Sequence, residues 1–159
     1  MGKGSKERML GDGMTIPFDL DRFIEAQTAA FETAIAEIRR GRKRSHWMWY
    51  IFPQLAGLGR SDIAERYAIR SIAEAQAYLA HPLLGRRLEE CVAAVQDLTA
   101  ANPEAVFGEI DAMKLRSSLT LFINAGGGPL FEAALARWFS GEQDGATLHL
   151  LKSAPSGPA

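Results

Sequence analysis

One stretch of sequence decides the fold class: residues 19–40, DLDRFIEAQTAAFETAIAEIRR. Its apolar side chains recur every three or four residues, a spacing typical of an α-helix with one buried face. Asp19 or Asp21 can cap the start of such a helix, and Gly41 stands where it would end. The stretch therefore predicts a long amphipathic helix over 19–40.

The rest of the chain continues this helical pattern. Ser45, Ser71, Asn102 and Asp111 each precede a run with helical spacing, and each can accept a hydrogen bond from a backbone N–H in the first turn. No segment shows the convincing period-2 alternation that marks a half-buried strand. We predict helices over 46–52, 62–67, 72–80, 82–100, 103–108, 112–123, 129–140 and 144–151.

Length and composition favour a single domain. The chain has 159 residues, of which 47% are hydrophobic and 23% charged, as in ordinary globular proteins. A core of that size needs neither a disulfide nor a structural metal. We predict an all-α fold, a compact single-domain bundle of two long and several short helices over 17–152, with flexible tails over 1–16 and 153–159.

Several functional classes are disfavoured by the same numbers. A net charge of −1 gives no overall attraction to nucleic acid or to anionic membranes. Cys91 has no second cysteine to pair with, and no apolar stretch reaches the roughly 18 residues that span a bilayer. His81 and His149 lack the neighbours of a recognised metal site. We therefore expect a cytoplasmic protein without a metal or cofactor.

A basic run followed by aromatic residues is the most unusual feature of the sequence. Five of the six residues from 39 to 44 are basic, and SHWMWYIFP follows over 45–53. Arg42 and Lys43 suit phosphate groups, whereas Trp47 and Trp49 suit stacking on a base. A helix start at Ser45 would add free N–H groups for an anion.

A structural interpretation of the same run is equally consistent with the sequence. The cations would then be a solvated helix end that complements the helix macrodipole, and Trp47, Ile51 and Phe52 would be core residues. His46 can act as a general acid or base because the pKa of a free histidine lies near neutrality, but a lone histidine is more often a hydrogen-bonded structural residue.

Polar residues inside predicted helices supply the other candidate contacts. Gln27 lies on the inward face of the first helix, where it demands a hydrogen-bond partner and either ties two helices together or binds a ligand amide or base edge. On the helix that follows Asp111, four polar residues interrupt an apolar pattern, and they indicate either close helix packing or the wall of a pocket. They are Lys114, Arg116, Ser117 and Thr120.

The motifs together resemble a family. RKRSHWMWYIFPQL over 42–55, followed by Gly57-Leu58-Gly59, resembles the hallmark of a bacterial and fungal family of unknown function. Further matches cover about residues 18–151. Some members carry the label calpastatin, which implies protease inhibition by a disordered, repeated polypeptide, and a compact helical chain does not have that character. The family motifs fall on 19–27, 43–53 and 114–120, so we predict that these segments converge on one cleft, with Arg22 among its ligand contacts.

A second and shorter resemblance concerns activity. Phe23-Ile24-Glu25-Ala26-Gln27 resembles the helix of a helical N-glycosidase family that acts on ADP-ribose-like or riboside phosphates. The chain lacks that family's other landmarks, including its catalytic glutamate paired with a Trp-Gly motif. If the protein is an enzyme, this resemblance implies hydrolysis of an N-glycosidic bond, with His46 or Asp111 assisting proton transfer.

The resulting functional hypothesis is a pocket for a phosphorylated, nucleotide-like small ligand. Its anion contacts would be Arg42, Lys43, Lys114 and Arg116, and Trp47 or Trp49 would stack on its ring. The alternative is a non-enzymatic module whose basic and aromatic surface docks a protein or a nucleic acid. A third interpretation assigns the aromatic excess to a homodimer interface.

Overall fold

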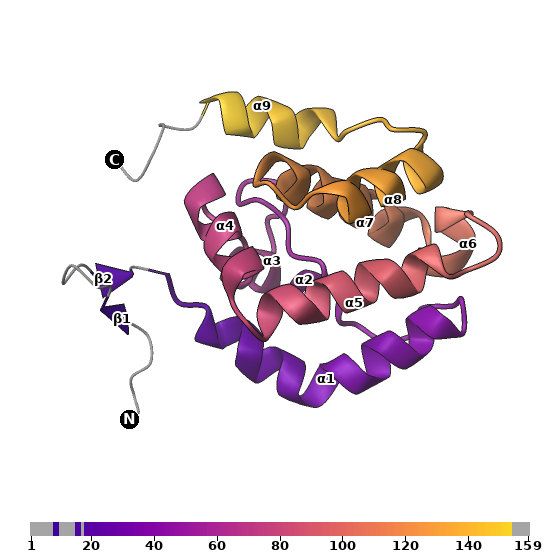
Figure 1. Ribbon diagram of the computed structural model, residues 1–159, viewed down its shortest axis with the longest axis horizontal. Helices are drawn as coiled ribbons and strands as arrows, with labels where there is room; N and C mark the ends of the chain where they lie inside the picture. Colours follow the sequence, from indigo (N-terminus) through magenta and orange to yellow (C-terminus); the bar gives the residue numbers. More distant parts are fainter. Residues whose placement is uncertain (1–7, 10–14, 17, 154–159) are drawn as a thin grey trace.

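The computed structural model describes residues 8–9, 15–16 and 18–153, and within them the protein is an all-α fold, as predicted (Figure 1). Its helices are α1 (Asp21–Arg39), α2 (Met48–Ile51), α3 (Asp62–Arg66), α4 (Ile72–Ala80), α5 (Leu84–Gln96), α6 (Pro103–Phe107), α7 (Glu109–Asn124), α8 (Pro129–Phe139) and α9 (Gly145–Ser153).

The longer helices are stacked. In Figure 1, α1 runs along one side of the molecule, α5 lies on it, α7 and α8 follow, and α9 covers the far side. α5 packs against both α1 and α8, whereas α7 contacts α4, α6, α8 and α9. α7 is therefore the helix around which the C-terminal half is assembled.

A chain of aromatic rings runs through the core and joins four helices. Phe23 on α1 packs edge-on against Tyr78 on α4, with ring centroids 5.1 Å apart. Tyr78 lies 5.4 Å from Phe122 on α7, which lies 6.2 Å from Phe131 on α8. Ring pairs at these distances contribute roughly 0.5–1.5 kcal/mol each beyond the apolar area they bury. The series fixes α1 and α4 against the α7–α8 pair.

Several helix starts agree with the sequence analysis. The Ser71 side chain accepts a hydrogen bond from the N–H of Glu74 at 3.1 Å, and the Asn102 side chain accepts one from Ala105 at 3.1 Å. Ser61 caps α3 in the same way, through the N–H of Ala64. At these positions a polar side chain directly precedes a helical run, so local sequence is sufficient to define the cap.

Three other predicted caps are wrong. α1 is preceded by Leu20, which makes no side-chain cap, so neither Asp19 nor Asp21 serves as one. α7 begins at Glu109, because Gly108 adopts a φ of 82° that ends α6 and lets the next helix start at once. Asp111 consequently lies inside the first turn of α7, with its carboxylate free to pair with cations.

The third wrong cap is Ser45. α2 starts at Met48 with Trp47 at its N-cap position, so the predicted helix over 46–52 is shorter than expected. Ser45 lies in the preceding connection, where its hydroxyl bonds to a carboxylate on α1. The free N–H groups expected at Ser45 for binding an anion are therefore absent from this position.

A small β-ladder lies near the N-terminus, where no strand pattern was found. β1 (Arg8–Met9) pairs antiparallel with β2 (Thr15–Ile16), with Arg8 opposite Ile16 and Met9 opposite Thr15. Each strand has two residues, which is too short for a period-2 pattern to be recognised. The ladder precedes the helical part of the chain (Figure 1).

Cys91 is part of the core of α5. Its side chain has no exposed surface, and burial, followed by the nearby charge of Glu90, raises the pKa of its thiol to about 12. Among the residues that the structure describes, no helix has the length and hydrophobicity needed to cross a membrane. Within the same ranges, no group of three or more His, Cys, Asp or Glu side chains is arranged to hold a metal ion.

Candidate functional site

A buried carboxylate organises the connection between α1 and α2. Glu37, in the last turns of α1, is 3% exposed. Its Oε1 accepts hydrogen bonds from the N–H groups of Arg44 and Ser45 at 2.8 and 3.0 Å and from the Trp47 indole at 2.9 Å. Its Oε2 accepts one from the Ser45 hydroxyl at 2.6 Å. One side chain thus accepts four hydrogen bonds from Arg44, Ser45 and Trp47.

The Glu37 carboxylate remains ionised because of these donors. Burial by itself raises its pKa. The hydrogen bonds from the Ser45 hydroxyl, the two backbone N–H groups and the Trp47 indole have the larger, opposite effect and bring the pKa down from 4.5 to about 2. Trp47 is held in the core with 1% of its surface exposed. Ser45 and Trp47, both expected to contact a ligand, therefore serve to fold this connection in the structure.

Lys43 crosses from the same connection to α7. Its Nζ lies 2.8 Å from Oδ2 of Asp111, and it also donates to the backbone carbonyl of Ser45. Lys114, one turn further along α7, approaches the other carboxylate oxygen of Asp111 at 3.6 Å. Two ammonium groups therefore share one carboxylate, and the segments 43–53 and 114–120 meet here, as predicted.

Trp49 is the half-buried indole of the motif. The Lys114 ammonium lies 4.7 Å from the centre of a Trp49 ring, within the range of a cation–π contact. Among the described residues, no acceptor bonds to the indole N–H of Trp49, whereas those of Trp47 and Trp138 bond to Glu37 and Gln96. Trp49 therefore differs from both other tryptophans in having a free donor.

These groups line a surface hollow of about 440 Å³ between the α1–α2 connection, α2 and the start of α7. Its walls combine cations, acids and apolar side chains. They are formed by Lys43, His46, Met48, Trp49, Phe107, Gly108, Glu109, Ile110, Asp111 and Lys114. A hollow of this size falls within the range of small-molecule sites.

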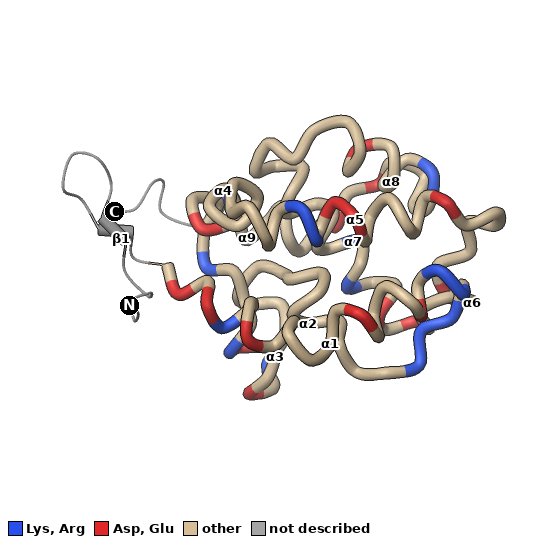
Figure 2. Tube along the Cα trace, turned by 60° about the horizontal axis from the view of Figure 1, so that its bottom comes forward, with Lys and Arg blue, Asp and Glu red and all other residues tan. Residues whose placement is uncertain are grey.

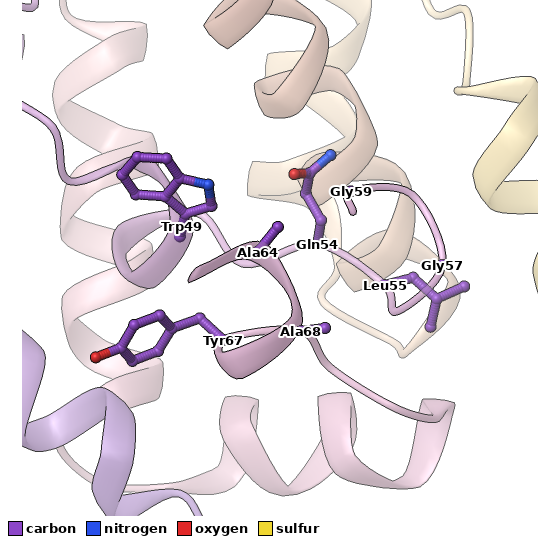
Figure 3. A pocket seen from close by; sticks show the side chains of 8 residues that line it. All are labelled: Trp49, Gln54, Leu55, Gly57, Gly59, Ala64, Tyr67 and Ala68. Carbon is purple, nitrogen blue, oxygen red and sulfur yellow. The ribbon is translucent and has the colours of Figure 1, made fainter. Parts of the chain in front are cut away.

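A second, much narrower cavity is also bordered by Trp49 (Figure 3). It holds about 10 Å³, roughly the space of one water molecule, between Trp49, Gln54, Tyr67 and the glycine-containing loop. In Figure 3 the nitrogen-bearing edge of the Trp49 ring is on the side where the Gln54 amide lies. Trp49 is thus a wall shared by two cavities.

Gln27 belongs to the core and does not line the hollow. Its amide nitrogen donates to the carbonyl of Tyr50 at 2.7 Å and to the hydroxyl of Tyr78 at 3.0 Å, and its side-chain oxygen accepts from Arg87 at 3.4 Å. Gln27 is 1% exposed. It joins α1 to α2, α4 and α5, which matches the helix-tying role of the two considered for it.

Arg22 lies at the opposite end of α1, and its side chain is also bonded to other parts of the protein. Its guanidinium pairs with Glu74 at 3.1 Å and donates to the carbonyls of Arg66 and Ala68 at 2.8 and 2.7 Å. The third segment, 19–27, reaches the motif through the hydrogen bond from Gln27 to the carbonyl of Tyr50, away from the hollow. Convergence of all three segments on one cleft is not what the structure shows.

The remaining polar residues of α7 pack against its own backbone and α9. Ser117 donates to the carbonyl of Met113, and Thr120 donates to that of Arg116 and accepts from the N–H of Asp144. Arg116 faces Glu142 and Asp144 at 3.5 and 3.8 Å. This face of α7 fastens the start of α9 and is separate from the residues that line the hollow.

The exposed arginines occupy the outer side of the connection. Arg42 and Arg44 point to solvent and form no ion pair with any residue in the described ranges. His46 is exposed and lines the hollow. Of the predicted site residues, the structure thus brings together His46, Trp49, Asp111, Lys43 and Lys114.

Glu37 is the residue that sequence reasoning missed. It follows Ala34 by three positions and directly precedes Ile38, both on the buried face of the helix. A glutamate at such a position, shortly before a connection rich in donors, is a signal of a buried, hydrogen-bonded carboxylate. The pattern indicates its burial, whereas its partners depend on how the connection folds.

Comparison with known proteins gives the family. Residues 17–151 match the model of a family described as "Protein of unknown function (DUF1810)", and the chain belongs to this family. It is also similar to the conserved hypothetical protein Rv1873 from Mycobacterium tuberculosis, known from a crystal structure at 1.38 Å, with 48% identity and a TM-score of 0.85. That similarity covers 87% of this chain and 100% of the other. No curated protein matches.

Proposed function

We propose that this member of a family of unknown function binds a small phosphorylated ligand with a planar ring, such as a nucleotide, in the hollow between α2 and α7. One observation carries the proposal. The ammonium of Lys114 lies over the half-exposed ring of Trp49, 4.7 Å from the ring centre, and both residues line the hollow. A cation beside an aromatic face offers both contacts that a nucleotide needs.

Two cations are available to an anion here. Lys43 and Lys114 both approach the carboxylate of Asp111, while Glu109 adds an exposed carboxylate elsewhere on the wall of the hollow. The Lys43 side chain is only 7% exposed and is held by Asp111 and Ser45, so it is a positioning group. Lys114 is 23% exposed and lies further from the carboxylate, so its ammonium is the better placed of the two to bind a phosphate.

The ring contact falls to Trp49 because Trp47 is buried. Trp49 offers a half-exposed indole and an N–H that bonds to no described residue. A base that stacks on this ring would gain about 1–3 kcal/mol, the range found for aromatic–base stacking. The apolar side chains of Met48 and Ile110 border the same hollow and can cover the other edges of the ring.

The test is a thermal-shift series with AMP, ADP, ADP-ribose, NAD and sugar phosphates. A ligand at about a hundred times its Kd stabilises the folded state by about 2.7 kcal/mol. In a domain of this size that corresponds to a rise in Tm of roughly 5–10 °C. We expect the rise for nucleotides in the wild type and its loss in both Lys114→Met and Trp49→Leu.

Matched controls separate a lost site from a damaged fold. Lys152→Met removes an exposed lysine of α9, and Phe139→Leu removes a half-buried aromatic ring of α8, both away from the hollow. Both controls should keep the full ligand-induced shift. A shift that survives in Lys114→Met and Trp49→Leu, or the absence of any shift while all variants are folded, would overturn the proposal.

Hydrolysis of an N-glycosidic bond is a second candidate, favoured by the presence of His46 and Asp111 on the wall of the same hollow. His46 is exposed and can donate a proton to a departing base, while water enters from the open side. We expect base release from a bound nucleotide to be abolished in His46→Gln, with the binding shift retained. Equal release by the wild type and this variant would exclude His46 from the reaction.

A further inference from the structure

The connection after α1 presents an outward row of cations that leads to the hollow. Exposure alternates along it: Arg42, Arg44 and His46 are exposed, whereas the side chains of Lys43 and Ser45 turn inward to Asp111 and Glu37. The outward row therefore begins at Arg42 and ends with His46 on the wall of the hollow.

Four consecutive backbone hydrogen bonds hold this row in place. The N–H of Arg42 bonds to the carbonyl of Glu37 at 3.1 Å, and that of Lys43 bonds to the carbonyl of Val106 at 2.8 Å. The N–H groups of Arg44 and Ser45 bond to the Glu37 carboxylate at 2.8 and 3.0 Å. The backbone of residues 42–45 is thus held in place, whereas the side chains of Arg42 and Arg44 form no ion pair with the described residues.

Positive charge at this corner is not balanced by ion pairs. Figure 2 shows Lys and Arg segments gathered beside α6, where α1 has ended. Arg39 and Arg40, in and after the last turn of α1, are exposed like Arg42 and Arg44, and none of the four pairs with an acid in the part of the chain that the structure describes. The exposed acids Glu104 of α6 and Glu109 of α7 form no ion pair with these arginines.

We infer that this row binds the backbone of a single-stranded nucleic acid, one nucleotide of which occupies the hollow against Trp49. The inference rests on the proposed function and names the ligand as a strand. Arg42 and Arg44 lie outside the lining of the hollow, so a ligand that contacts them as well as Trp49 must extend beyond it. Arginines supply phosphate contacts and an aromatic ring supplies stacking, the combination typical of single-strand sites.

Fluorescence anisotropy with a labelled oligothymidylate of about twelve nucleotides tests the inference. Arg42→Ala/Arg44→Ala removes two outward cations, and Arg70→Ala/Arg86→Ala is the charge-matched control, taken from exposed arginines outside this connection. We expect binding that weakens steeply with salt and a loss of about tenfold or more in the first variant only. Two fewer phosphate contacts should also reduce the slope of log K against log salt by about 1.4.

Competition and thermal shift separate this inference from the proposed function. TMP and TTP are compared with the unlabelled strand as competitors, and TMP is also tested by thermal shift. TMP binding that depends on Trp49 and Lys114, with a strand that binds no better than TTP, would overturn the strand inference and leave the proposed function intact.

Strand binding that depends on Arg42 and Arg44 but is unchanged in Trp49→Leu would retain the arginine row and refute the site in the hollow. Equal losses in both arginine double variants would also overturn the inference.

Discussion

At the scale of single residues, Glu37 determines how the motif is displayed. Its carboxylate gathers the Ser45 and Trp47 side chains and two backbone N–H groups, so Trp47 turns inward. Trp49, two positions later, remains half-buried beside Lys114. One buried acid therefore decides which tryptophan can meet a ligand.

Glu37→Gln should destabilise the protein by roughly 2–3 kcal/mol, because hydrogen bonds to an ionised group are lost and an amide N–H₂ is placed against other donors. The measurement is the urea midpoint followed by circular dichroism. Glu32→Gln on the exposed side of α1 is the control and should change stability little. Equal effects of the two substitutions would refute the assigned role of Glu37.

Glu37 also makes the stability of the folded protein depend on pH. The pKa of Glu37 is about 2 in the folded protein against an ordinary value of 4.5, so its stabilisation is fully present above about pH 4.5. As the pH falls toward 2, the unfolded chain takes up a proton that the folded protein does not, and up to about 3 kcal/mol is lost. The stability difference between wild type and Glu37→Gln should narrow over this interval. A constant difference would contradict the low pKa.

At the scale of helices, the α4–α5 junction requires a glycine. A Cβ added to Gly85 would lie 2.0 Å from the carbonyl oxygen of Leu79, a backbone atom that cannot move away cheaply. Gly85→Ala should therefore destabilise the protein by about 3 kcal/mol or more, although alanine is the better helix former. Thermal unfolding tests this against Gly145→Ala, where no atom lies within 4 Å. Similar Tm values for the two variants would disprove the close approach.

Helices were predictable where their determinants are local. Predicted caps placed α4 and α6 because Ser71 and Asn102 act on their own first turns. The start of α7 was not predictable in the same way, because the positive φ of Gly108 moved it upstream of Asp111. The motif helix α2 was also shorter than expected, since the donors around Ser45 bond to Glu37 in another element.

At the scale of the whole molecule, the aromatic series from α1 to α8 predicts one cooperative unit. Phe23, Tyr78, Phe122 and Phe131 link both halves of the chain, so neither half should unfold alone. Urea unfolding followed by circular dichroism and by tryptophan fluorescence should give superimposable curves. Two separated transitions would show that the halves form independent domains.

The site depended on contacts that no local pattern contains. Part of the basic and aromatic run lines the hollow, yet the pairing of Lys43 with Asp111 joins residues far apart in the chain. Sequence alone could not separate Trp47 from Trp49, because their neighbours are alike and only the fold places one ring on Glu37. Arg22, Gln27 and Thr120 look like site residues in sequence but tie helices together.

The most direct test of the binding hollow is a ¹⁵N correlation spectrum of the three indole N–H groups, recorded as AMP is added. Trp47 and Trp138 are internal controls, since their N–H groups are bonded to Glu37 and Gln96. We predict a saturable shift of the Trp49 signal, absent in Lys114→Met, with the other two signals unmoved. An unchanged Trp49 signal at saturating AMP, or equal shifts of all three, would contradict a nucleotide site beside Trp49.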